Sequence, residues 1–498
     1  MAMRIRMSFP VGAVMVLLSS CAVGPNYQPP RTETEAPATF LAQDPGAAGE
    51  PVVADWWAAL RAPVLDRLIS EALASNADLA AAEARVQQSR ALVRISGAQY
   101  YPTFNADGRV SRDKLSRNGE NLALIPFEPP RTEFTDYRLG FDAVWEIDLA
   151  GKTRRDVEAT VARLGSSEEL RNDARSVLTA EVASAYVDYL AAMARLHVAE
   201  ADRSRAAEVL ELDALQVRAG TLSETDRRRV EAEARNAEAA VPPLAAARDA
   251  AMLQLVALTG TSRDAVAALL ADATALPEAP QAAPVGLPGD VLRRRPDVRH
   301  AERELAAATA DVGSAIAARF PRLTLVGDAG WDSVQPGKLV QSASRYWNIG
   351  PQLTVPIFSA GRLRAQSEAA ASSRDAAEAS YRAAVLRAVA DAETGLVRLA
   401  ADRERQRSVT ASAQALAVAA QHEQLRYGAG DASRIEVLQA ERALDAAEDG
   451  RIAEQAQVLK DYVSLGKSLG FGWQERVGAA VAARADAGRA GEPTLKAP

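Results

Sequence analysis

Residues 347–364 read WNIGPQLTVPIFSAGRLR. Apolar side chains stand at alternate positions from Trp347 to Ile357, with polar or small residues between most of them. A period of two is typical of a strand with two unlike faces. After Gly361 the chain continues for roughly 65 residues almost without Gly or Pro, rich in the helix formers Ala, Arg, Glu and Leu. The stretch therefore predicts a strand that leads directly into a very long helix.

The same pattern occurs earlier in the chain, where residues 137–154 read YRLGFDAVWEIDLAGKTR. Gly140 recurs as Gly350, a shift of 210, and upstream Pro102 recurs as Pro321, a shift of 219 (350−140 and 321−102). The first copy therefore carries nine extra residues (219−210) between these two landmarks. Self-similarity at a long, fixed spacing indicates an internal duplication.

Each repeat is expected to hold shorter helices, two strands and a long helical hairpin. The first long helix, from Gly151 to about Gln216, would measure about 100 Å at 1.5 Å per residue. The chain then returns as a second helix, which we expect to be interrupted at Pro242-Pro243. The predicted divisions are a signal peptide at 1–20, an extended segment at 21–54, a first repeat at 55–270, a Pro-rich linker at 271–288, a second repeat at 289–472 and a disordered tail at 473–498.

Composition excludes several classes of protein. The hydrophobic content of 48% is inflated by Ala, and only 5% of residues are aromatic, which favours slender helix packing over one thick core. The net charge of −7 and the lack of a basic stripe argue against a nucleic-acid partner. The three His residues are far apart in the sequence, so no metal site is predicted. The sequence also shows no nucleophile–base pair and no pair of carboxylates, so we expect neither an enzyme nor a cofactor. The run Arg293–Arg295 is interpreted as a solvated turn of charge.

The N-terminus combines a signal peptide with the only cysteine of the chain. Arg4 and Arg6 precede an apolar run that is too short to span a bilayer, and this run ends at Leu18-Ser19-Ser20-Cys21. Small residues before a lone Cys resemble a bacterial lipoprotein cleavage site, which implies that Cys21 becomes the lipidated N-terminus. Acyl chains contribute about 0.8 kcal/mol per buried CH₂, so several chains anchor firmly in lipid. Ala22, where an Asp would retain the protein, favours the outer membrane.

Four alternating strands with one apolar and one polar face are the pattern of a transmembrane barrel. Four strands cannot close, and lipid tolerates no open strand edge. Barrels begin at about eight strands, so several copies of the chain must assemble, and three copies would give twelve strands. The alternative from alternation alone is a soluble sandwich whose apolar face is covered by protein.

Several motifs make the chain similar to a known family. They are the run Cys21–Tyr27, the pair Trp56-Trp57, GLPGDVLRRRPDVRHAE at 286–302, FPRL at 320–323, and Gly350-Pro351 with Pro356-Ile357-Phe358 and Gly361-Arg362. These motifs resemble the TolC-like outer membrane factors, the exit ducts of tripartite efflux pumps, and in particular their NodT-type lipoprotein subfamily.

The resemblance implies a membrane α+β fold in which a homotrimer shares one twelve-stranded β-barrel in outer membrane lipid. The barrel would be continuous with α-helical coiled-coil hairpins that form a tunnel across the periplasm. The implied partners are a periplasmic adaptor (membrane fusion) protein and an inner membrane transporter of the resistance-nodulation-division (RND) type.

The resemblance also assigns roles to the hairpin turns. The residues implied to dock the adaptor are Gly220, Thr221, Ser223, Gly430, Asp431 and Ser433. The implied periplasmic gate consists of Tyr427 before the second turn, Glu436 after it, and Asp226, a carboxylate on the first hairpin that the tyrosine can reach. One turn after Glu436, where many members carry a second acid, this chain has Gln439. A double acidic ring is therefore not expected.

Two other functions fit parts of the pattern. The exit duct of a type I protein secretion system shares the fold and would be encoded beside an ABC transporter. A structural envelope lipoprotein with a coiled-coil stalk would place no strands in the bilayer and would conduct no ions. The leading hypothesis is a passive efflux duct.

Overall fold

The computed structural model describes residues 22–30, 55–116, 132–281 and 292–474. The predicted signal peptide, Cys21, the end of the linker and almost all of the predicted tail lie outside the described residues. Contacts divide the chain into two compact units. The first comprises Met1–Pro29, Gln87–Ser166 and Glu302–Ser380, and the second comprises Pro30–Val86, Ser167–Ala301 and Tyr381–Pro498.

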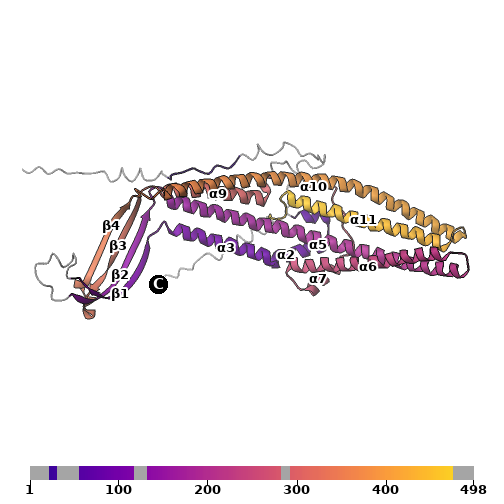
Figure 1. Ribbon diagram of the computed structural model, residues 1–498, viewed down its shortest axis with the longest axis horizontal. Coiled ribbons are helices and arrows are strands. Elements are labelled where there is room, and N and C mark those ends of the chain that lie inside the picture. The colour runs from indigo at the N-terminus through magenta and orange to yellow at the C-terminus, as the bar shows by residue number, and fades with distance from the viewer. Residues whose placement is uncertain (1–21, 31–54, 117–131, 282–291, 475–498) are drawn as a thin grey trace, which may run out of the picture. The chain divides into compact units, whose positions relative to one another are not determined.

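The elements alternate between helical stretches and pairs of strands along the chain (Figure 1). In the first half they are η2 (Trp56–Leu60), α2 (Pro63–Ser75), α3 (Ala77–Ala98), β1 (Thr103–Lys114), β2 (Glu133–Ile147), α5 (Lys152–Arg218), α6 (Glu224–Thr259) and α7 (Arg263–Leu270). In the second half they are α9 (Pro296–Ala317), β3 (Arg322–Ser333), η3 (Pro336–Lys338), η4 (Ser342–Ser344), β4 (Arg345–Thr354), α10 (Arg362–Ala429) and α11 (Arg434–Ser468).

The duplication is present in the element boundaries themselves. α3 and α9 begin 219 residues apart (296−77), and so do β1 and β3 (322−103). α6 and α11 begin 210 residues apart (434−224). The long helices α5 and α10 contain 67 and 68 residues. The predicted internal repeat, the four strands and the two long helical hairpins are confirmed.

The four strands form one antiparallel sheet in the order β1-β2-β3-β4 (Figure 1). Its strand pairing repeats with the duplication: Thr103 lies opposite Val144 in the first repeat, and Arg322 lies opposite Thr354 in the second. β2 pairs with β3 and so joins the two repeats. β1 and β4 are the edge strands of this sheet.

The core of the second unit packs the middle of the long helices around two tryptophans. Trp56 and Trp57 are 2% and 5% exposed and meet edge to face with ring centroids 5.8 Å apart. Tyr462 of α11 packs on Trp56 at 6.1 Å between ring centroids. Leu, Val and Ala from α2, α5, α6, α10 and α11 complete the cluster. The Ala-rich composition therefore reflects close helix packing, as the sequence predicted.

The expected break at Pro242-Pro243 is wrong, because α6 continues through both prolines to Thr259. Proline lacks the N–H that a helix interior uses and normally kinks or ends the helix. Here both prolines and the preceding turn, including Glu238 and Ala239, are exposed. Water can hydrogen-bond the carbonyl groups that the prolines leave free, so the helix persists.

Candidate functional site

One face of the sheet is apolar and exposed. Residues that pair across neighbouring strands lie on the same face of the sheet. On the apolar face, Val110 pairs with Tyr137 and Ala329 pairs with Trp347. Exposed large hydrophobic side chains on it include Phe104 (75%), Val110 (68%), Phe141 (59%), Trp347 (76%) and Ile349 (63%). Contiguous apolar surface of this kind marks a protein or membrane contact. An exposed apolar sheet face of this kind is typical of strands whose outer side chains contact lipid.

The opposite face of the sheet carries a polar network. Arg138 of β2 binds Asp328 of β3 with 3.1 Å between Nη2 and Oδ2, and its Nε donates to the Tyr346 hydroxyl at 2.8 Å. The guanidinium also lies 4.4 Å from the centroid of the Tyr346 ring. A Cβ at Gly140 would lie 2.5 Å from the Tyr346 hydroxyl, so a larger residue there would displace the Tyr346 side chain from this network. Polar groups facing one side and apolar groups facing the other are typical of strands between lipid and an aqueous lumen.

Residues 22–29 belong to the first unit and form a short extended strap there. The Val23 N–H donates to the Ala150 carbonyl at 3.1 Å. Arg155, whose side chain is 4% exposed, donates from Nη2 to Asn26 Oδ1 at 2.6 Å. A Cβ on Gly24 would lie 2.6 Å from the Cα of Gly313, so only glycine fits at position 24. This fixes the residues directly after Cys21 beside the short connection between β2 and α5.

The two hairpin turns have the same geometry. Each long helix ends at a glycine with positive φ, 74° at Gly220 and 83° at Gly430, a conformation that glycine adopts without steric cost. The N–H of the next residue bonds back five positions, from Thr221 to Gln216 at 3.0 Å and from Asp431 to Arg426 at 2.8 Å. This is the Schellman arrangement of a helix C-terminus.

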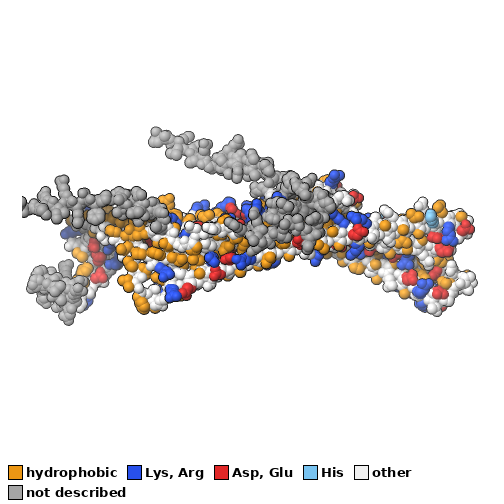
Figure 2. Space-filling model, turned by 90° about the horizontal axis from the view of Figure 1, so that it is seen from above, with side chains coloured by type: hydrophobic (Ala, Val, Ile, Leu, Met, Phe, Trp, Pro, Cys, Tyr) orange, Lys and Arg blue, Asp and Glu red, His pale blue; other side chains and the backbone are white. Residues whose placement is uncertain are grey.

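Serine caps the helix that follows each turn. The Ser223 hydroxyl accepts from the Asp226 N–H at 3.1 Å, and the Ser433 hydroxyl accepts from the Glu436 N–H at 3.3 Å. All six residues predicted to dock an adaptor are exposed and lie in these two turns, from Gly220 to Ser223 and from Gly430 to Ser433. In Figure 2 the side chains around the turns are a mixture of basic and acidic groups.

The gate residues are close to the turns, but a single chain does not join them as expected. The Asp226 carboxylate accepts a hydrogen bond from the Ser223 hydroxyl at 2.7 Å. Tyr427 is 43% exposed. The pKa of the nearby Arg434 guanidinium is raised mainly by its hydrogen bonds to Glu208, and Tyr427 is only a minor cause. No hydrogen bond joins Tyr427 to Asp226 among the contacts of the described chain. The hydroxyl of Ser223, which caps α6, donates to one oxygen of this carboxylate instead.

Glu436 belongs to a capping box. Its Oε2 accepts from the Ser433 N–H at 2.6 Å, while its own N–H donates to the Ser433 hydroxyl. These hydrogen bonds from Ser433 lower the pKa of Glu436. The carboxylate is therefore ionised and held over the first turn of α11.

Ion pairs hold the two hairpins of the second unit together near the turns. Arg434 forms a bidentate pair with Glu208 at 2.8 and 3.1 Å, which links α11 to α5. Farther along, Arg205 binds Glu441 at 3.0 Å and Asp445 at 2.5 Å. Most of these side chains are about one-third exposed, so water and salt weaken each single pair. As a series they set how closely the second hairpin packs on the first.

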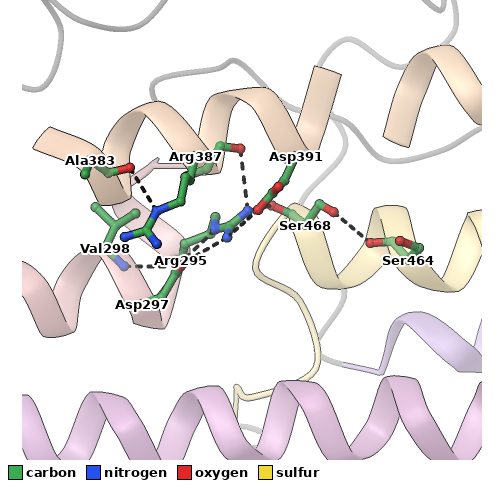
Figure 3. A network of polar contacts seen from close by, with 9 residues as sticks. Arg295, Asp297, Val298, Ala383, Arg387, Asp391, Ser464 and Ser468 are labelled. Carbon is green, nitrogen blue, oxygen red and sulfur yellow. Dashed lines mark hydrogen bonds and ion pairs between the residues drawn. The ribbon is translucent and has the colours of Figure 1, made fainter. Parts of the chain in front are cut away.

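The interpretation of Arg295 as solvated charge is wrong. Its side chain is 11% exposed and lies between α9, α10 and the end of α11 (Figure 3). It forms a bidentate pair with Asp297 at 3.0 and 2.7 Å and a further pair with Asp391 at 3.1 Å, and it donates to the Ser468 carbonyl. Although burial opposes it, Arg295 lowers the pKa of Asp297. The residue joins three helices rather than facing water.

The polar face, the apolar face and the paired hairpins can be compared with known proteins. The model of the outer membrane efflux protein family matches residues 68–261 and 287–471. The chain belongs to this family. It is an outer membrane efflux channel, a transport protein and not an enzyme.

Relatives of this efflux channel match over nearly the whole chain. Nodulation protein T of Rhizobium leguminosarum bv. viciae is 28% identical over 474 residues, which are 94% of each chain. The pyoverdine export outer membrane protein OpmQ of Pseudomonas aeruginosa is 31% identical over 468 residues, 92% of this chain and 96% of that protein. The solved outer-membrane channel OprN matches with a TM-score of 0.82 and 32% identity, over 91% of this chain and 100% of that one. The resemblance found in the sequence motifs is confirmed.

Two contact residues of the efflux channel were not predicted from the sequence, Arg155 and Arg295. Both lie close to residues whose local role can be recognised in the sequence. Arg155 follows the glycine turn at Gly151, and Arg295 precedes Pro296 and Asp297. An Asp two positions after an Arg at a helix start is a signal for a local ion pair. Which distant segments the arginines also bind could not be read from the linear sequence.

Proposed function

We propose that this chain is the exit duct of a tripartite efflux pump and works as a homotrimer. The observation that carries the proposal is the four-stranded sheet, with its exposed apolar face, its polar face and its two edge strands β1 and β4. An open edge in lipid leaves backbone N–H and C=O groups unpaired, at a cost of several kcal/mol each. Pairing β4 of one copy with β1 of the next removes both edges, and three copies reach twelve strands.

The proposed partners are a periplasmic adaptor protein and an RND-type inner membrane transporter. The exposed turns at Gly220–Ser223 and Gly430–Ser433 support an adaptor contact, because both copies of the repeat present the same capped geometry there. A docking protein with a repeated surface can then bind each turn alike. The transporter supplies the energy, and the duct conducts passively.

The proposed inner gate combines Tyr427, Asp226 and Glu436. Tyr427 and Asp226 are not bonded within one chain, so the proposal is that their contact requires the assembled hairpins. Glu436 supplies a fixed negative charge beside the second turn, held by Ser433. Such charges near a narrow mouth favour cations.

The lipid anchor is proposed at Cys21. The strap supports it, because Val23 and Asn26 fix the following residues near Ala150, three residues after the end of β2. An acyl chain on Cys21 would therefore be joined directly to a segment that is fixed on the first unit.

The transported solutes are proposed to be small molecules. OpmQ is described as a pyoverdine export protein, and the efflux names of the relatives favour a pump over a protein secretion duct. The choice among solutes is proposed to rest with the inner transporter.

The test is native mass spectrometry of the full chain in detergent, followed by recordings in planar bilayers. Trimers that conduct ions are the expected result. A dominant monomer with full strand content, or a trimer that never conducts, would contradict the proposal and favour the structural lipoprotein.

A further inference from the structure

The apolar face of the sheet ends in cations at the strand ends that lie away from the helices. Beyond Val110, the next residues of β1 on this face are Arg112 and Lys114, since every second residue of a strand shares a face. On β4 the same face begins at Arg345, two positions before Trp347. Arg112 and Lys114 are each 75% exposed at the side chain, and Arg345 is exposed as well. We call Arg112, Lys114 and Arg345 the basic rim.

The basic rim keeps most of its positive charge. Glu133 of β2 lies on the same face, with its carboxylate 2.7 Å from Lys114 Nζ and 3.7 Å from Arg112 Nη2. Arg345 forms no ion pair with any residue that the structure describes. Three cations and one carboxylate leave a net charge of +2 per chain on this part of the face (3−1). Because these side chains are exposed, their mutual ion pairs are weak and the cations can bind a further anion.

The other face of the sheet is acidic at the same strand ends. Asp113 separates Arg112 from Lys114 along β1, so its side chain points to the opposite face. Asp136 of β2 and Asp332 of β3 share that face with Asp113. Strand ends that only met water would not need to separate charge by face. The separation indicates that the two faces have different surroundings here, an aqueous lumen on one side and an anionic layer on the other.

The basic rim lies about one membrane thickness from the helices. β1 begins at Thr103, five residues after α3 ends at Ala98. From Thr103 to Arg112 the strand advances by nine residues (112−103), which is about 31 Å at about 3.4 Å per residue. At a tilt of about 40° the strand rises about 23 Å, close to the apolar band of about 25 Å in a barrel. Trp347, which is 76% exposed, stands just inside Arg345, as the aromatic girdle of a barrel does.

The level of the basic rim identifies the layer that it meets. In the proposed pump the helices lie in the periplasm, so the opposite strand ends reach the outer leaflet. Lys and Arg just beyond an aromatic girdle lie at the depth of the lipid headgroups, where they cost little and attract anionic groups. In an outer membrane this leaflet is built mainly from lipopolysaccharide, a glycolipid whose innermost sugars carry phosphate.

We propose that the basic rim binds the phosphate groups of lipopolysaccharide at the seams between the copies of the channel. The inference rests on the proposed trimer, in which β4 of one copy pairs with β1 of the next. This pairing brings Arg345 of one copy to the edge strand that carries Arg112 and Lys114 of its neighbour. A phosphate monoester carries up to two negative charges, and a guanidinium group can bind two of its oxygens at once. Lipid bound at the seam contacts two copies and holds them together.

Native mass spectrometry of the full chain in detergent tests the basic rim. The added probes are lipid A, which is the phosphorylated anchor of lipopolysaccharide, a dephosphorylated lipid A, and phosphatidylglycerol. Trimers should retain lipid A in preference to both other lipids. Each of Arg112→Gln, Lys114→Gln and Arg345→Gln removes one cation near the membrane surface and should weaken lipid A binding about fivefold.

The matched control is Arg109→Gln. Arg109 lies on the same strand and is exposed, but it belongs to the opposite face, where it pairs with Arg138. This variant removes the same charge from the trimer and should leave lipid A binding unchanged. Arg345→Lys keeps the charge and loses only the planar guanidinium, so it should bind lipid A more tightly than Arg345→Gln does.

The possible failures can be told apart in one spectrum. Trimers that retain no lipid A, or that retain phosphatidylglycerol equally well, would overturn the proposed ligand. Equal losses in Arg109→Gln and in the three rim variants would show that only the total charge of the protein matters. Trimers of all three rim variants that bind lipid A as the wild type does would remove the rim as its site. A spectrum without trimers would instead contradict the proposed function, and the seam site with it.

Discussion

Replacing Ile349 by Arg tests which face of the sheet meets lipid. Ile349 lies near the middle of β4, is 63% exposed, and stands opposite Gly327, which offers no side chain to shield it. Arg at the middle of a lipid-facing band costs about 2–4 kcal/mol. At about 1.4 kcal/mol per factor of ten, this corresponds to a loss of roughly 30- to 700-fold in the folded fraction per chain. Three copies in a trimer would multiply the effect.

The matched control is Asn348→Arg, one residue away on the polar face. Asn348 stands opposite Asp328, so a new guanidinium there meets a carboxylate and water. We expect a change within about 0.5 kcal/mol, as for an ordinary surface substitution. The assay is guanidinium unfolding of reconstituted protein in lipid vesicles, followed by tryptophan fluorescence. Equal stability of the two variants, or greater damage from Asn348→Arg, would refute the assignment of the faces.

Further predictions concern the anchor and the gate. Cys21→Ala should abolish incorporation of labelled fatty acid, and a wild-type protein that takes up no label would leave Cys21 without a role. Tyr427→Phe should raise the resting conductance of the purified trimer, whereas unchanged bilayer recordings would return Tyr427 to an ordinary surface residue. Glu436→Gln should weaken cation preference while keeping the capping box, since Gln also accepts from the Ser433 N–H; an unaltered reversal potential would speak against a gate charge. Because the pKa of Glu436 is lowered, its capping stabilisation should be present above the ordinary pKa of Glu and be lost as pH falls through the lowered value. Exchange of the amides in the first turn of α11 between pH 6 and pH 3 measures this, and constant protection would contradict it.

Much of the fold could be predicted because both repeats carry the same sequence signals. Alternation around Gly140 and Gly350 gave the strands, and the spacing to Gly220 and Gly430 gave the hairpins. Local signals of this kind depend only on backbone geometry and side-chain period. The prediction of a helix break at Pro242 failed because the free-energy cost of a proline inside a helix depends on the solvent around that helix, which the sequence does not specify.

The charged contacts were harder to predict. Arg295 and Asp461 look like solvated surface residues in an Ala-rich helical sequence, and only the packing of distant helices buries them. For Asp461, the signal was its position between Leu459 and Tyr462 on the apolar side of α11, a place where a carboxylate is costly. Tyr427 and Asp226 were matched by family position, and no hydrogen bond joins them in the part of the chain that the structure describes.

The repeat of strand pairing within the chain has a consequence for the seam between chains. β2 pairs with β3 so that Phe141 lies opposite Ala329. Since β4 copies β2 at a shift of 210 and β1 copies β3 at a shift of 219, a closed ring of the three proposed copies would have pseudo-sixfold symmetry (141+210=351 and 329−219=110). Pro351 of one subunit should then stand opposite Val110 of its neighbour. The wall of the duct would be six nearly equivalent hairpins, in which covalent and non-covalent joints alternate.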